Sequence, residues 1–433
     1  MRFAFFSTEG FGFAWWMRLL GEGHDVRVFI KEKDARSVGE GFVERADSED
    51  GLLRWASQDD NTIYVFEMTG FGDLADRLRS RHKKVVGSSV LGDKLEDRSY
   101  GQRVASLAGI RVPKSERFGT ITDALDFVRK LAPAAKWYFK AEKKGLASNF
   151  TYGGHDRDDL RYMMEYFKQC AGDIPCLLQQ KVEGLVTDIS WWWTGSRIVG
   201  YIGTIEYKAA YTGDLGPGTM SATTLSWKFA EAEPKLAKQL KLQDVAELFK
   251  RLHIPAGPYD INCVISEANR QPYFLEWGPR FGWDSDTVFL QGLTRPWGEA
   301  LAALAAGTIS EMPFVPSEYM GGLHVAVQPY PYTNYPDVKH SAYRVPVRGL
   351  PDLVGDRFSP YGLMIEDGHL KVASPYGNVG VALGKGSSVK EVTTDIYKVC
   401  KELQIPDAWW RTDFGKHEAD DLQTLKRLGY DAA

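Results

Sequence analysis

Short apolar runs alternate with helical patterns through the first hundred residues. The spacing predicts a helix over Phe13–Leu20 and a charged helix over Asp73–Arg81. Short apolar strands that alternate with helices are typical of βαβ units, so we expect a parallel sheet here. The runs predicted as its strands are Phe3–Phe6, Val26–Ile30, Ile63–Phe66 and Val85-Val86.

The middle of the chain changes to longer helices and paired strands. An amphipathic helix is expected over Thr122–Leu131, with Thr122 as its cap. A long helix is expected from Pro234 to just before Pro255. Further helices are predicted over Leu95–Ala108, Arg157–Gln169, Thr294–Ala306 and Val389–Leu403, and strands over Lys136–Ala141, Leu177–Val182, Thr187–Thr194, Ile198–Glu206, Tyr259–Ile265 and Pro272–Trp277. The last two strands are separated by a short polar turn, which favours an antiparallel hairpin.

Composition narrows the class of protein. The chain has 433 residues, of which 44% are hydrophobic and 25% charged, which is ordinary for a globular protein of about three domains. A net charge of −4 disfavours a general nucleic-acid coat. The four cysteines are scattered, so we expect reduced thiols and a cytoplasmic protein. Charged residues interrupt Met1–Leu20, and no run reaches the length of a membrane helix, so neither a secretory leader nor a membrane anchor is expected.

Glycine loops offer two places for phosphate. Gly10-Phe11-Gly12 follows the first strand, but it lacks a third glycine and an acidic residue on the second strand, which disfavours a nicotinamide site. Lys140 ends a predicted strand and precedes the glycine-bearing loop Lys143–Ser148. Backbone amides and ammonium groups over such a loop suit a polyphosphate, although a solvated lysine loop has the same composition.

Glu276 is a carboxylate inside an apolar strand. Such a group must be paired or bound to a metal. Asn262 or Asp260 on the partner strand could face it, and oxygen ligands of this kind suit Mg²⁺. A buried pair between Glu276 and Arg280 is the structural alternative. A third candidate is Lys208, which precedes a glycine-rich stretch, 213–218, that is either a ligand contact or a plain surface loop.

Taken together and in this order, these features resemble an ATP-grasp ligase, and most closely the glycinamide ribonucleotide synthetase family. The resemblance covers nearly the whole chain. The segments that carry it are Leu91–Pro113, Phe139–Ala141 with Gly145–Ala147, Gln179–Gly184, Lys208–Pro217, Glu276–Gly282 and Trp410–Gly415.

The chain also departs from the family. The family's G-G-R-E-H cluster is Glu9–Phe13 here, and its N-T-G-G-M-G segment is reduced to Gly218–Ala222. Its C-terminal G-G-R loop is replaced by Pro375–Asn378, and its metal-side asparagine is Gly278. The first three departures lie where the second substrate is expected. We therefore expect the phosphorylating machinery to be kept and the amine acceptor to differ.

The resemblance implies a fold, a reaction and a set of site residues. The fold is mixed α/β and α+β: an N-terminal parallel-sheet (pre-ATP-grasp) domain over 1–112, an ATP-grasp domain over 113–312 with lobes 113–185 and 186–312, and a small mostly-β domain over 313–433. ATP and Mg²⁺ (or Mn²⁺) would drive amide formation through an acyl phosphate, from a small glycine-like amino acid to an amine of nucleotide type. The catalytic residues would be Lys208, Glu276 and Arg280, those that bind ATP would be Lys94, Lys140, Gln180, Lys181, Val182, Asp188 and Asp214, and the metal ligands would be Glu276 and Asn262.

Two other functions stay open. Loss of the asparagine at Gly278 is what a nucleotide-binding pseudoenzyme would show. The basic run over 77–84 would suit a ligase that acts on a modified base or a nucleic acid, although a solvated helix face has the same pattern.

Overall fold

The computed structural model describes residues 1–142, 151–282, 285–316, 318–332, 342–350, 357–374 and 376–430. The N-terminal domain is a five-stranded parallel sheet in the order β3-β2-β1-β4-β5, which confirms the predicted sheet. Its elements are β1 (Arg2–Ser7), α1 (Phe13–Gly21), β2 (Asp25–Ile30), β3 (Glu44–Arg45), α2 (Glu49–Ala56), β4 (Ile63–Phe66), α3 (Gly72–Ser80), β5 (Lys84–Val86), α4 (Val90–Leu95) and α5 (Arg98–Leu107).

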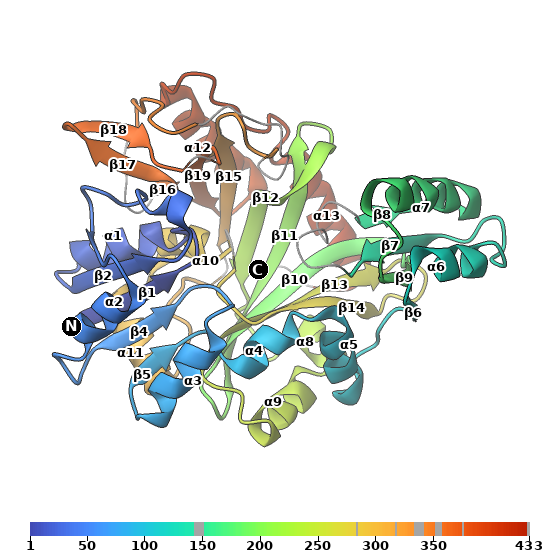
Figure 1. The fold of residues 1–433 in the computed structure, drawn as a ribbon, viewed down its shortest axis with the longest axis horizontal. Coiled ribbons are helices and arrows are strands. Elements are labelled where there is room, and N and C mark those ends of the chain that lie inside the picture. The colour runs from blue at the N-terminus through green and yellow to red at the C-terminus, as the bar shows by residue number, and fades with distance from the viewer. Residues whose placement is uncertain are drawn as a thin grey trace.

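A small lobe projects from the body of the molecule (Figure 1). It is a four-stranded sheet in the order β6-β9-β7-β8, covered by two helices. Its elements are β6 (Ser115–Phe118), α6 (Ile121–Val128), β7 (Trp137–Ala141), β8 (Thr151–Gly153), α7 (Arg157–Ala171) and β9 (Cys176–Gln180). Thr120 caps α6, and not Thr122 as predicted, because the backbone and hydroxyl of Thr122 instead donate to Asp173.

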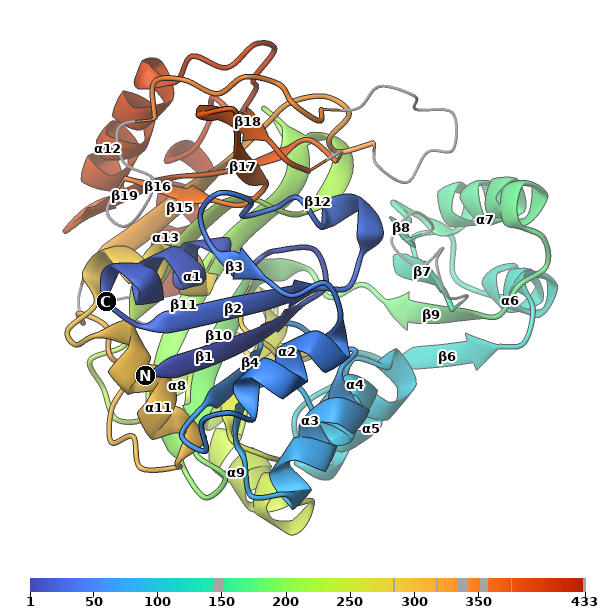
Figure 2. The same ribbon diagram turned by 60° about the vertical axis from the view of Figure 1, so that its left-hand side comes forward.

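The largest sheet has eight strands in the order β14-β13-β10-β11-β12-β15-β19-β16. It runs without a break across the predicted domain boundary at 312, so the C-terminal strands extend the large lobe (Figure 2). Its strands are β10 (Gly184–Trp193), β11 (Ile198–Tyr211), β12 (Leu215–Lys228), β13 (Gly257–Ser266), β14 (Pro272–Gly278), β15 (Tyr319–Ala326), β16 (Phe358–Pro360) and β19 (Asn378–Gly386). The remaining elements are α8 (Lys235–Gln239), α9 (Leu242–Arg251), α10 (Ser285–Val288), α11 (Trp297–Ala305), the hairpin β17 (Leu363–Glu366) and β18 (His369–Val372), α12 (Val389–Glu402) and α13 (Lys416–Arg427).

Three consecutive tryptophans place β10 between two hydrophobic cores. Side chains alternate between the faces of a strand. Trp191 and Trp193 accordingly face a core that contains α9, whereas Trp192 faces the core shared with α11 and the N-terminal sheet. All three are buried, which confirms the predicted strand. The large sheet therefore packs against an apolar core on each face, and these two cores hold its strands in position.

Two predicted helices are interrupted. The helix expected from Pro234 divides into α8 and α9 because Lys241 adopts a left-handed φ of +53° between them. The helix expected over Leu95–Ala108 begins only at Arg98, where Asp97 caps α5. Within the described residues, no helix is long and apolar enough to cross a bilayer.

Candidate active site

A cleft of about 660 Å³ lies where α5, the small lobe and the large sheet meet. Polar and charged side chains line much of it, among them Glu96, Arg98, Arg117, Glu142, Asp188, Glu206, Lys208, Asp260, Asn262, Glu276 and Arg280. Five of the predicted site residues are in this set: Asp188, Lys208, Asn262, Glu276 and Arg280. They come from β10, β11, β13, β14 and the segment after β14, so the structure brings together residues that are up to 92 positions apart in the chain (188 to 280).

Glu276 lies within an array of cations. Its Oε1 is 3.6 Å from Nζ of Lys208, and about half of its side chain is exposed to the cleft. Burial alone raises the pKa of Glu276, but Lys208, Lys140 and Arg280 outweigh it, and the pKa falls below its ordinary value. The alternative of a Glu276–Arg280 ion pair is not what forms. Arg280 instead lies 3.8 Å from Glu96.

Oxygen-bearing side chains collect on one face of the β13–β14 hairpin. Asn262 is the cross-strand partner of Glu276, as the sequence predicted, and Asp260 is the partner of Gly278. A Cβ atom at position 278 would overlap the carboxylate of Asp260. Asp260 thus fills the space that opens where the family's asparagine is missing. Asn262 Nδ2 also donates to Asp260 Oδ1 at 3.5 Å, which keeps the two side chains together.

Lys140, on the small lobe, is not among the residues that line the cleft, but its charge helps to lower the pKa of Glu276. It projects from β7 and donates to Oε1 of Gln179 at 2.7 Å. Burial and the nearby Arg98 lower the pKa of Lys140 to about 8. A cation in this position is poorly solvated, so an anionic ligand would gain more from it than from an exposed lysine. The predicted phosphate loop that follows, Lys143–Ser148, lies outside the described residues.

The predicted ATP-binding residues Gln180, Lys181 and Val182 form the hinge between β9 and β10. The amide of Gln180 donates to Lys114 O at 2.8 Å and that of Lys181 donates to Lys136 O at 3.0 Å, so both donors are used within the chain. Recognition of an adenine edge at this hinge would therefore depend on the carbonyls and on Val182. Asp188 lies on β10 opposite Asn262, inside the cleft.

The structure places Arg98, and not the predicted Lys94, at the cleft. Lys94 is exposed at the end of α4 and is not among the residues that line the cleft. Arg98, which the sequence analysis did not select, lines the cleft and reaches the carbonyl of Ala141 at 3.4 Å. The chain changes direction in the turn between α4 and α5. The sequence analysis expected one continuous helix from Leu95, and so did not predict this change of direction.

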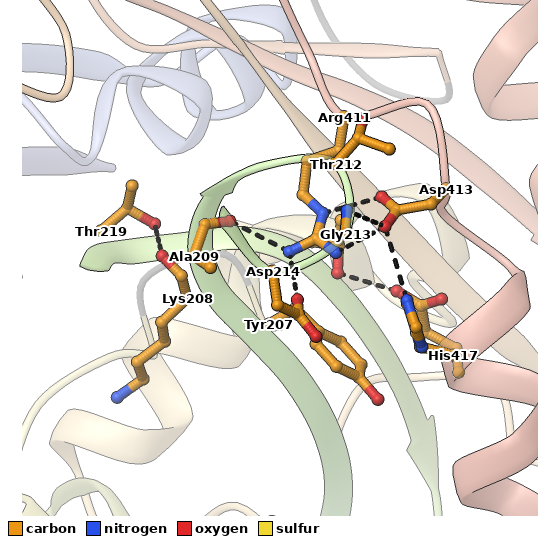
Figure 3. Close-up of polar contacts among 12 residues, drawn as sticks. Tyr207, Lys208, Ala209, Thr212, Gly213, Asp214, Thr219, Arg411, Asp413 and His417 are labelled. Carbon is orange, nitrogen blue, oxygen red and sulfur yellow. Dashed lines mark hydrogen bonds and ion pairs between the residues drawn. The ribbon is translucent and has the colours of Figure 1, made fainter. Parts of the chain in front are cut away.

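A buried arginine holds the hairpin that carries Lys208 (Figure 3). Arg411 is 2% exposed and donates to Ala209 O at 3.0 Å, to Asp214 at 2.7 Å and to Asp413 at 2.8 Å. Asp413 in turn accepts the amide of Gly213 at 2.9 Å. Asp214, predicted to bind the cofactor, therefore has its carboxylate paired within the chain, and it lines a smaller neighbouring cavity rather than the cleft. The segment Trp410–Gly415, which resembles the family sequence, therefore binds the end of the β11–β12 hairpin through Arg411 and Asp413.

We expect Arg411→Ala to lower the free energy of unfolding by about 2 kcal/mol. It removes charge-assisted hydrogen bonds and leaves Asp413 with fewer partners. Urea unfolding measures the change. Arg427→Ala is the matched control, because Arg427 makes an exposed ion pair with Glu267 and its loss should cost well under about 1 kcal/mol. Equal effects of the two substitutions would contradict the role given to Arg411.

Comparisons with known proteins agree with this geometry. No protein-family model matches the chain. A phosphoribosylamine–glycine ligase from Corynebacterium ammoniagenes is 23% identical over 349 residues, which is 79% of each chain. The solved phosphoribosylamine–glycine ligase from Thermotoga maritima superposes with a TM-score of 0.71 at 18% identity, over 95% of this chain and 100% of that one. The chain has the ATP-grasp fold and resembles phosphoribosylamine–glycine ligase.

The ATP-grasp fold is shared more widely. An L-amino acid ligase from Bacillus licheniformis superposes with a TM-score of 0.58 at 14% identity, over 94% of this chain and 98% of that one. At such identity the likeness shows the fold alone. Together with the curated relative, it confirms the predicted fold class and the predicted enzyme class, an ATP-grasp ligase.

Proposed function

We propose that this ATP-grasp protein joins the carboxylate of a small amino acid to an amine, with ATP as the source of energy and an acceptor other than phosphoribosylamine. The observation that carries the proposal is Glu276, a carboxylate of lowered pKa that faces Lys208 and Asn262 in the cleft, with the charge of Lys140 nearby. Cations and hard oxygen ligands side by side are what a metal–triphosphate complex needs. The curated relatives, which are phosphoribosylamine–glycine ligases by name, support the carboxylate–amine class.

The residues present fit a divalent metal ion. The described residues contain no cluster of three Asp, Glu, His or Cys side chains suited to a metal. The β13–β14 face instead combines the carboxylates of Asp260 and Glu276 with the amide oxygen of Asn262, a donor set suited to Mg²⁺ that keeps several ligands from water and phosphate. When bound, Mg²⁺ would neutralise charge on the phosphate oxygens.

The chain's own residues would position the reaction. Lys140 and Arg98 would hold the polyphosphate, Lys208 would face the γ-phosphate beside Glu276, and Arg280 would hold the amino-acid carboxylate. A carboxylate oxygen then attacks the γ-phosphorus, ADP leaves, and an acyl phosphate results. The acceptor amine attacks the acyl carbon, phosphate leaves with its bonding electrons, and the amine loses a proton to solvent. Positioning and charge stabilisation are sufficient, because phosphoryl transfer needs no covalent catalyst.

A phosphate-release screen tests the proposal. The full chain is incubated with ATP and Mg²⁺, each small amino acid in turn, and a panel of amines that includes phosphoribosylamine and nucleosides that carry an amine. We expect release that depends on one amino acid, with kcat/KM for phosphoribosylamine below about 10⁴ M⁻¹s⁻¹. Efficient glycinamide ribonucleotide formation would show that the acceptor is unchanged. ATP binding with no phosphate release under any condition would identify a pseudoenzyme.

Lys140→Ala should weaken ATP binding by about 10- to 150-fold, since one charge-assisted hydrogen bond is worth roughly 1.5–3 kcal/mol. Titration calorimetry measures the affinity. Lys136→Ala is the control, because Lys136 lies just before the same strand and pairs with Glu183 outside the cleft. If ATP binds both variants as tightly as it binds the wild type, Lys140 has no part in the nucleotide site.

A further inference from the structure

The N-terminal sheet has its own place for a ligand. The strand order is β3-β2-β1-β4-β5, so the chain runs from β1 to β2 and β3 on one side of the sheet and then adds β4 and β5 on the other side of β1. The direction of the connections therefore reverses between β1 and β4. Open sheets bind ligands beyond the carboxyl ends of the strands at such a point. Helix α1 begins here, and Gly12 offers no side chain to its first amides. A strand end beside an uncapped helix N-terminus is the usual position for a phosphate.

In this protein a carboxyl group from the chain already occupies that position. Glu67, directly after β4, is 1% exposed and accepts a hydrogen bond from Ser7 Oγ, which itself accepts the amide of Gly10 at 2.7 Å. The amides of Phe11 and Gly12 also favour the charged form of the Glu67 carboxyl. A Cβ atom at position 12 would overlap Oε2 of Glu67, so only glycine lets the carboxyl approach the helix so closely.

The surroundings are acidic as well. Burial and the neighbouring Glu32 raise the pKa of Glu9 in the loop after β1. Burial is the main cause that raises the pKa of Tyr376, and the carboxylates of Glu9, Asp34 and Glu32 raise it further. Lys31, from the same turn as Glu32, lies with its ammonium 5.3 Å from a phenylalanine ring centre. The negative charge of Glu9, Glu32 and Asp34 near this edge disfavours a phosphate and favours an amine.

We propose that Glu67 closes the anion position between β1 and β4, and so selects an acceptor amine that carries no phosphate at this edge of the sheet. This inference rests on the proposed ligase function, since it concerns that reaction's acceptor. The carboxyl excludes phosphate by filling the space beside Gly12 and by occupying the loop amides of Phe11 and Gly12 that precede α1. Truncating the side chain should reopen the position, whereas an isosteric replacement should leave it closed.

Calorimetry with ribose 5-phosphate as the probe tests this in the full chain. Glu67→Ala should bind ribose 5-phosphate at least about 10-fold more tightly than the wild type, because one or two charge-assisted hydrogen bonds become available. Glu67→Gln should bind it no better than the wild type. Glu67→Ser provides a second truncation in case the alanine variant does not fold. Glu418→Ala is the matched control, because Glu418 is also 1% exposed and sits at a helix N-terminus, at the start of α13.

The outcomes separate the two proposals. A gain in the truncated variants alone supports the role of Glu67. If neither folded truncation gains affinity, or if the wild type binds ribose 5-phosphate as tightly as they do, the role of Glu67 is refuted. The measurement needs no turnover, so failure of the ligase proposal shows separately, as a lack of amino-acid-dependent ADP formation by the wild type.

Discussion

Glu276→Gln should abolish ADP formation and leave the fold intact. The substitution keeps the side-chain volume but removes the charge that faces Lys208, Lys140 and the proposed metal ion. Several kcal/mol of charge stabilisation would be lost, and about 4 kcal/mol corresponds to about a 1,000-fold lower rate. Coupled-enzyme detection of ADP, in the presence of the amino acid found by the phosphate-release screen, measures the loss.

The control for this variant lies on the same hairpin. Glu267→Gln removes a charge from the β13–β14 turn, where Glu267 pairs with Arg427 outside the cleft. Its activity should stay within about twofold of the wild type, and circular dichroism should show both variants folded. Near-normal turnover by folded Glu276→Gln would mean that the carboxylate is not part of the phosphorylating site.

Local pattern was enough to predict β10, β13 and β14, whereas the predicted strand over Ile198–Glu206 ends before Lys208, which lies on β11. The apolar runs Ile63–Phe66 and Pro272–Trp277 were predicted to be strands, and both are. The polar turn between the last two predicted strands indicated a hairpin, in which Asn262 lies opposite Glu276. Strand pairing of this kind depends on neighbours in the sequence, so a single chain contains the information.

Residues selected by long-range packing could not be predicted in the same way. Arg411 meets Asp214 across 197 positions, and nothing near either residue indicates the partner. Lys94 was predicted from the family resemblance, and the reorientation at Asp97, which brings Arg98 to the cleft, is visible only in three dimensions. Asp260 was an open alternative to Asn262 in the sequence, whereas the hairpin register places both on the same face.

Glu67 was overlooked although a signal was present. A carboxyl group directly after an apolar parallel strand falls at the carboxyl edge of a sheet, where ligands and catalytic groups gather. The strand order that puts β4 beside β1 was needed to bring Glu67 under the Gly10–Gly12 loop. The glycines of that loop match half of a dinucleotide motif, but the glycine at position 12 makes room for a carboxyl of the protein itself.

Glu67 should also make the stability of the protein depend on pH. Burial raises its pKa from 4.5 to about 8, against the opposing effect of Ser7 and the loop amides. Between these values the folded state keeps a proton that the unfolded state has lost, so the free energy of unfolding falls as pH rises from about 4.5 to 8. Glu67→Gln cannot titrate, and it resembles the protonated acid in shape and in having a donor. Relative to the wild type, it should therefore gain about 4 kcal/mol of stability between pH 5 and pH 9. Urea unfolding across this range gives the difference directly, and a constant offset between the two proteins would show that the Glu67 carboxyl is already ionised at pH 5 in the folded state.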